Sequence, residues 1–125
     1  MLKNQKGFTL LEIIAVLVIL GILAAVATPK YFSLIEEAQK NAAESAIGEV
    51  KARANLYYAL KTLRDKNAPS AAAIFASVTA APNVGPDFGV TAAADGTGDI
   101  TITVNSVKGA AITAVTGIWT YPVAD

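Results

Sequence analysis

The pattern of polar and apolar residues divides the chain near its start. Residues 13–27 are all apolar apart from Gly21, and Glu12 is the one charged side chain in the twenty residues 8–27. A helix of that length spans roughly 30 Å, which is the thickness of the hydrocarbon core of a membrane. The pattern therefore predicts a transmembrane helix over residues 8–29.

A second helical pattern follows directly and predicts an amphipathic helix over residues 30–66. Its charged residues are dispersed, and Glu36 and Lys40 form a favourable i,i+4 pair. We expect the globular part formed by the rest of the chain to pack on residues 50–63. We expect residues 38–46 to contact another helix. The apolar stripe consists of Tyr31, Ile35, Ala38, Ala42, Ala46, Val50, Ala54 and Tyr57.

Two residues weaken the first part of this long helix. Pro29 cannot donate a hydrogen bond to the carbonyl of Ala25, and Gly21 lowers helix propensity by about 1 kcal/mol relative to alanine. The segment between them could therefore kink or extend. A simple proline kink at the membrane edge is the alternative.

The remaining residues, 67–125, predict a small antiparallel sheet. Asn67-Ala68-Pro69 ends the long helix, and Ser70 is a candidate N-cap for a short helix through residue 77. Alternating residues and turn signals predict strands over about 88–92, 99–105 and 112–121, with turns at 95–98 and 106–109. The predicted fold class is α+β, with about three strands packed on residues 50–63.

The segment Lys6-Gly7-Phe8-Thr9-Leu10-Leu11-Glu12 resembles the leader junction of a type IV prepilin. The resemblance implies that a prepilin peptidase removes residues 1–7 by cutting between Gly7 and Phe8 and then methylates the amine of Phe8. It also implies that Glu12 neutralises the Phe8 amine of a neighbouring subunit. Gly21 and Pro29 fall where this family places helix-breaking residues.

The leader has three other interpretations. An ordinary secretory signal would use residues 24–27 as its cleavage site, but Glu12 interrupts its apolar run and a helix continues past Pro29. A plain signal anchor would make Glu12 accidental. A buried helix of a soluble protein would not need the basic leader.

A physical argument supports a role for Glu12 in assembly. An unpaired charge in lipid or among packed helices is strongly penalised, whereas a charge pair is penalised far less. The apolar surfaces of the helices would otherwise allow several axial offsets between neighbours. Pairing of Glu12 with the cationic amine of a neighbouring Phe8 would therefore select one of these offsets, as buried polar groups do in coiled coils.

The composition excludes several function classes. The net charge is zero, and loss of residues 1–7 would remove Lys3 and Lys6 and leave −2, which predicts no nucleic-acid partner. The chain has no histidine and no cysteine, so we expect no enzyme, no cofactor and no catalytic or metal-binding residues. The segment Asp95–Asp99 resembles a calcium-binding turn, but calcium takes about six to eight oxygens, and we expect a plain β-turn.

The sequence thus predicts a pilin of a type IV pilus, a helical homopolymer of this chain. The resemblance implies an assembly ATPase and a platform protein as further partners. Before assembly the chain would cross the inner membrane once, with Lys3 and Lys6 in the cytoplasm and the sheet in the periplasm; after assembly it would lie in an extracellular pilus. The alternatives are a pseudopilin of a type II secretion system and a minor pilin acting in adhesion or DNA uptake.

Overall fold

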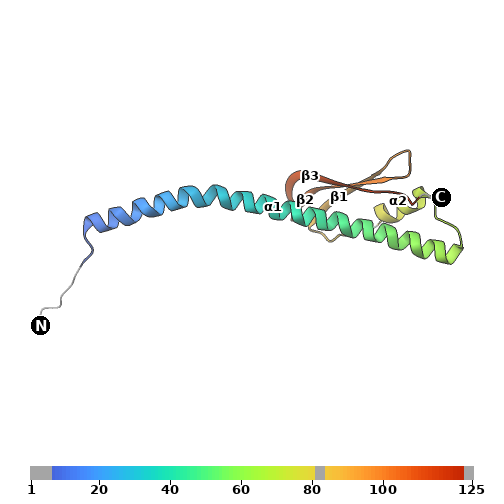
Figure 1. The fold of residues 1–125 in the computed structure, drawn as a ribbon, viewed down its shortest axis with the longest axis horizontal. Coiled ribbons are helices and arrows are strands. Elements are labelled where there is room, and N and C mark those ends of the chain that lie inside the picture. Colours follow the sequence, from blue (N-terminus) through green and yellow to red (C-terminus); the bar gives the residue numbers. More distant parts are fainter. Residues whose placement is uncertain (1–6, 81–83, 123–125) are drawn as a thin grey trace, which may run out of the picture. The chain divides into compact units, whose positions relative to one another are not determined.

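The computed structural model describes residues 7–80 and 84–122 of the 125-residue chain. Its elements are α1 (Leu10–Asp65), α2 (Ala71–Ala80), β1 (Phe88–Ala94), β2 (Ile100–Val107) and β3 (Ala110–Trp119), labelled in Figure 1. The described residues form two compact units, one ending at Ile35 and one starting at Glu36. The predicted α+β class is confirmed.

The first unit is the N-terminal part of α1. The helix continues through Gly21 and Pro29 without interruption. Next to the proline, the hydroxyl of Thr28 donates a hydrogen bond to the carbonyl of Ala24 at 2.8 Å. Its described residues, 7–35, are all exposed, so its apolar surface has no partner within the part of the chain that the structure describes.

The second unit contains a three-stranded antiparallel sheet in the order β1-β2-β3. The strand β2 alternates as the sequence indicated, with Ile100, Ile102 and Val104 buried toward α1. Their neighbours in β2 and the residues paired with those neighbours lie on the other face of the sheet. This outer face consists of Thr91, Ala93, Thr101, Thr103, Thr116 and Ile118.

The sheet packs on an earlier part of α1 than the sequence indicated. The buried residues of the helix are Ala43, Ala46, Ile47, Val50 and Ala54, and Tyr57 and Tyr58 pack against them while partly exposed. The leucines of the segment 50–63 point elsewhere, because Leu56, Leu60 and Leu63 are all more than half exposed. Ala43 and Ala46, which we expected to meet another helix, are covered within this unit.

The alanines on α1 allow a close approach of helix and sheet. A Cβ atom placed on Gly117 of β3 would lie 2.4 Å from Cγ2 of Ile47, so glycine is required there. Ile102, the partner of Gly117 in β2, is completely buried. The absence of a side chain at Gly117 therefore leaves room for Ile47 of α1 against the sheet.

The turn between β2 and β3 contains fewer residues than the predicted turn over residues 106–109. Residues Ser106 and Val107 belong to β2, and the turn consists of Lys108 and Gly109, which have φ of 51° and 75°. Two successive residues with positive φ form the type I′ turn that matches the twist of a hairpin. In β3 the register then shifts by two residues between Ala111 and Val115, because three residues there face Asn105 alone.

Two polar contacts join the end of β3 and the residues after it to α1 and to the segment between α1 and α2. The indole N–H of Trp119 donates to Oδ1 of Asn55 at 2.8 Å, and the hydroxyl of Tyr121 donates to the carbonyl of Pro69 at 2.8 Å. Ser70 caps α2 as predicted, because its hydroxyl accepts the N–H of Ala73.

Candidate processing and assembly site

The predicted site residues Gly7, Phe8 and Glu12 lie together at the start of α1. Gly7 and Phe8 are outside the helix and exposed, and 81% of the Phe8 surface is accessible. The peptide bond between them is therefore in a non-helical, open segment, as a peptidase substrate requires. The rest of the predicted leader, residues 1–6, lies outside the described residues.

Glu12 is held by a reciprocal pair of hydrogen bonds with Thr9. The N–H of Thr9 donates to Oε2 of Glu12 at 3.4 Å, and the N–H of Glu12 donates to the hydroxyl of Thr9 at 3.2 Å. This is the capping box, in which the first and fourth residues of a helix start satisfy one another's free N–H groups. The carboxylate of Glu12 is therefore directed at the residue that follows Phe8.

Thr9, which the sequence-based prediction did not include, takes part in this site. The signal was present, because a threonine followed three residues later by glutamate, ahead of an apolar run, is the capping-box pattern. The carbonyl of Thr9 accepts the N–H of Ile13 at 3.2 Å, which confirms Thr9 as the N-cap. The capping box and the helix dipole both favour a negative charge at Glu12.

This arrangement can hold a cationic group next to Glu12. If the chain is cut before Phe8, the new amine is one residue from the N–H that the carboxylate already accepts. A carboxylate has room for several donors, so Glu12 can accept from Thr9 of its own chain and from a second cation. Gly21 and Pro29 lie further along α1 and take no part in this cluster.

The segment Asp95–Asp99 is a turn held by its own carboxylates. Oδ1 of Asp95 accepts the hydroxyl of Thr97 at 2.6 Å and the N–H groups of Thr97 and Asp99 at 2.9 and 3.0 Å. These hydrogen bonds, the Thr97 hydroxyl first, hold the pKa of Asp95 below its usual value. Asp99 accepts the N–H of Tyr121 at 2.9 Å, so both carboxylates have structural partners.

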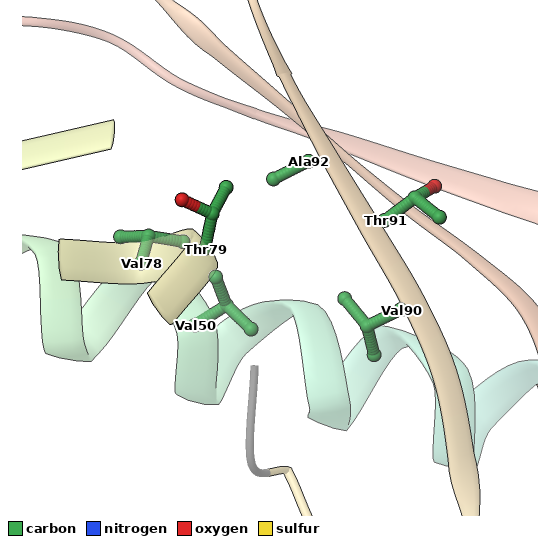
Figure 2. Close-up of a pocket in the computed structure, with 6 residues that line it drawn as sticks. All are labelled: Val50, Val78, Thr79, Val90, Thr91 and Ala92. Carbon is green, nitrogen blue, oxygen red and sulfur yellow. The ribbon is translucent and has the colours of Figure 1, made fainter. Parts of the chain in front are cut away.

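An apolar pocket lies where α1, α2 and β1 meet, with a volume of about 250 Å³ (Figure 2). No ionisable side chain lines it, so it offers no acid or base for catalysis. Among the described residues, no three histidine, cysteine, aspartate or glutamate side chains gather as metal ligands would. The lining residues are Val50, Val78, Thr79, Val90, Thr91 and Ala92.

The N-terminal part of α1 is long and apolar enough to cross a membrane. Residues 2–28 match the family model described as the prokaryotic N-terminal methylation motif. The chain is thus one of the proteins that carry this motif at the start of an apolar helix.

The known proteins to which this chain is similar are pilins and a type II secretion protein. The chain is 34% identical over 74 residues to the major component of a narrow type IV pilus of Thermus thermophilus, covering 59% of this chain and 60% of that one. It is 44% identical over 62 residues to a fimbrial protein of Eikenella corrodens, covering 49% and 40%. It is 42% identical over 55 residues to the type II secretion system core protein G of Dickeya chrysanthemi, covering 44% and 36%.

The motif and these relatives support the family of type IV prepilins and type II secretion pseudopilins for this chain. The matches span 60% of the first relative and less than half of the other two. The relatives are structural pilins and pseudopilins, not enzymes. No solved structure matches the chain significantly.

Proposed function

We propose that this chain is a structural subunit of a type IV pilus-like filament. A prepilin peptidase cuts after Gly7 and methylates the amine of Phe8, and the processed chain polymerises through its N-terminal helix. The single observation that carries the proposal is the position of Glu12, an exposed carboxylate held by Thr9 at the start of the apolar N-terminal part of α1.

Glu12 acts in this proposal as the acceptor for a neighbouring chain. In the filament, the methylated amine of Phe8 from one copy pairs with Glu12 of another copy in a water-poor environment. Because the hydrogen bonds with Thr9 already orient the carboxylate, little conformational entropy is lost when the amine arrives. The pairing fixes the stagger of helices whose remaining surface is apolar.

In the isolated chain, α1 continues through Gly21 and Pro29 without interruption. In the filament this segment is the place where helical hydrogen bonds are most easily given up, since proline supplies no N–H and glycine favours the extended state. We propose that these two residues let the helix loosen during assembly.

The proposed location changes with assembly. The precursor crosses the inner membrane once through residues 8–29, with its leader in the cytoplasm and the sheet in the periplasm. An assembly ATPase and a platform protein then move it into an extracellular filament. The family resemblance and the apolar helix support this topology.

A pseudopilin of a type II secretion system is the second candidate. The similarity to the core protein G of Dickeya chrysanthemi favours it specifically. Both functions require the same processing site, so the site does not separate them. A minor pilin acting in adhesion or DNA uptake is a third candidate that no contact in the structure favours.

Two measurements test the proposal. Mass spectrometry of the purified protein should find an N-terminus that begins at methylated Phe8. Electron microscopy of cells that produce the chain should then show surface filaments for a pilin, and no surface filaments for a pseudopilin, whose filament would stay in the periplasm. Retention of residues 1–7 in assembled filaments would contradict the proposed processing.

A further inference from the structure

The sheet has an edge along β3 that no other element continues. In the order β1-β2-β3, α2 contacts β1, whereas no strand among the described residues pairs with the free side of β3. Alternate residues of an edge strand point their N–H and C=O groups away from the sheet, so the free side of β3 presents unpaired donors and acceptors. The group that satisfies such a row is another extended strand.

The strand β3 lacks most of the features that protect sheet edges. Proteins guard their edges with short strands, charged residues, prolines or bulges. The strand β3 is ten residues long and contains no charged residue and no proline. Its bulge disturbs the part between Ala111 and Val115, but the pairing with β2 is regular from Val115 to Trp119. We call this regular part, Val115–Trp119, the open edge.

The charged residue that reaches the open edge lies below the strand. A Cβ placed on Gly117 would lie 3.4 Å from Nζ of Lys51 and 2.4 Å from Cγ2 of the buried Ile47. Lys51 is therefore on the face of β3 that packs against α1. On the opposite face, 58% of the Ile118 surface is accessible, and covering it would remove apolar surface from water.

A second copy of β3 matches this edge. Two identical strands that pair antiparallel form an isologous contact, in which both copies use the same surface. A pair centred on Gly117 uses all five residues of the open edge and places Thr116 of each copy opposite Ile118 of the other. Both residues are β-branched, which favours cross-strand contact, and no like charges meet in this uncharged strand.

The direction of β3 decides which second copy can pair with it. Gly117 lies against Ile47, and further along both elements Trp119 bonds to Asn55, so β3 runs in the same direction as α1. Antiparallel pairing of two β3 strands therefore sets the two α1 helices in opposite directions. Copies joined head to tail in one filament all point the same way, so the partner lies in another filament.

We infer that the open edge pairs antiparallel with the open edge of a second copy, in a filament that runs in the opposite direction. This inference rests on the proposed filament function and adds to it a contact between filaments. One pair of short strands is weak, but every copy repeats the edge, so the contacts along two filaments act together. Filaments from two facing cells have this orientation, and the pairing joins such cells.

Introduced cysteines test the register of the pair. The chain has no cysteine, so every disulfide joins introduced residues. Filaments of Thr116→Cys mixed with filaments of Ile118→Cys and oxidised with diamide should yield disulfide-linked dimers, because Cα atoms directly opposite lie about 4.5–5.5 Å apart, within the span of a disulfide. Neither variant alone should yield them, since diagonal neighbours are about 7–8 Å apart.

Thr101→Cys mixed with Ile118→Cys is the control for random collision. Thr101 lies on the same face of the sheet but in the middle strand β2, so this mixture should yield no dimers. Dimers in the control, dimers from Thr116→Cys alone, or no dimers in any mixture would overturn the proposed pairing.

Thr116→Lys tests the effect of the open edge on whole filaments. Thr116 faces away from the core, so filament yield should stay at the wild-type level. Lateral association of purified filaments, measured by light scattering and electron microscopy, should fall roughly tenfold or more, because like charges would face each other along the whole contact. Thr101→Lys adds the same charge to β2 and should associate as the wild type does.

Two results of this experiment would overturn the inference alone. One is wild-type filaments that stay single, and the other is an equal effect, or no effect, in Thr116→Lys and Thr101→Lys. If the wild-type chain forms no filaments at all, the proposed function itself fails, and this inference with it.

Discussion

The indole N–H of Trp119, the last residue of β3, donates to the side-chain oxygen of Asn55 at 2.8 Å. The two residues are 64 positions apart in the chain. Only 4% of the Trp119 surface is accessible, and its ring meets that of Tyr121 edge to face at a centroid distance of 6.2 Å. The hydrogen bond between Trp119 and Asn55 therefore connects β3, the last strand, to α1, which precedes the whole sheet in the sequence.

Asn55→Ala should destabilise the second unit. The indole N–H of Trp119 would lose its partner, and an unsatisfied buried donor costs about 1–3 kcal/mol. Urea unfolding of the detergent-solubilised protein can follow this through the fluorescence of Trp119, the one tryptophan in the chain. Thr113→Ala is a suitable control, since Thr113 is exposed in β3 and should change stability by less than about 0.5 kcal/mol.

Gly117→Val should also destabilise the second unit, through overpacking. The new Cβ would lie 2.4 Å from Cγ2 of Ile47, and forcing methyl groups into a packed contact costs about 1–3 kcal/mol. The same fluorescence measurement applies. Gly96→Val meets no neighbour within 4 Å, and an equal loss of stability in that variant would argue against a specific clash at Ile47.

Glu12→Gln separates the charge of Glu12 from its hydrogen bonds. Glutamine can still accept the N–H of Thr9, so membrane insertion and the helix start should be preserved. Assembly should fall sharply, because the neutral amide no longer compensates the cationic amine of Phe8. The measurement is filament yield relative to the membrane-inserted pool.

Thr9→Ala is the control for Glu12→Gln, because it alters the other partner of the same pair of hydrogen bonds. It removes the hydroxyl that caps the helix, which costs about 1 kcal/mol locally, but it keeps the carboxylate of Glu12. Filaments should therefore still form. Equal assembly defects in Thr9→Ala and Glu12→Gln would mean that the helix start matters and the charge does not.

The turn at Asp95 predicts a pH dependence of stability. Its pKa is lowered in the folded state by the hydrogen bonds from Thr97, so the folded protein favours the ionised carboxylate. This contribution is complete above the unfolded pKa of about 4 and is lost as the pH falls through the folded value. Wild-type stability should decrease in that acidic range.

Asp95→Asn checks the assignment of that pH dependence. The amide cannot titrate, so the variant should be less stable than the wild type at neutral pH and should lose less stability on acidification. Unfolding curves collected between neutral pH and about pH 3 measure both effects. A variant with the wild-type pH profile would assign the titration to another carboxylate.

The sequence predicted the elements well where the pattern was strict. The alternation of Ile100, Ile102 and Val104 with threonines identified β2, and Pro69 with Ser70 identified the boundary between α1 and α2. These are local signals, in which one residue type decides the backbone around it.

The predicted apolar stripe identified the face of α1 that the sheet covers, but not how far along the helix the sheet lies. Periodicity alone does not distinguish an alanine of the stripe under the sheet, such as Ala46, from one beyond it, such as Ala38, which is exposed. The choice is made by long-range contacts, including the fit of Ile47 against Gly117. The bulge in β3 was missed for a related reason, since register depends on the partner strand.

The outer face of the sheet, with its four threonines, makes no contribution to the packing of β2 on α1. Replacements at Thr101, Thr103 or Thr116 should therefore leave the core unchanged. A protein built in this way can alter the chemistry that it displays to its surroundings, such as a surface, a receptor or an antibody, at little risk to its own folding.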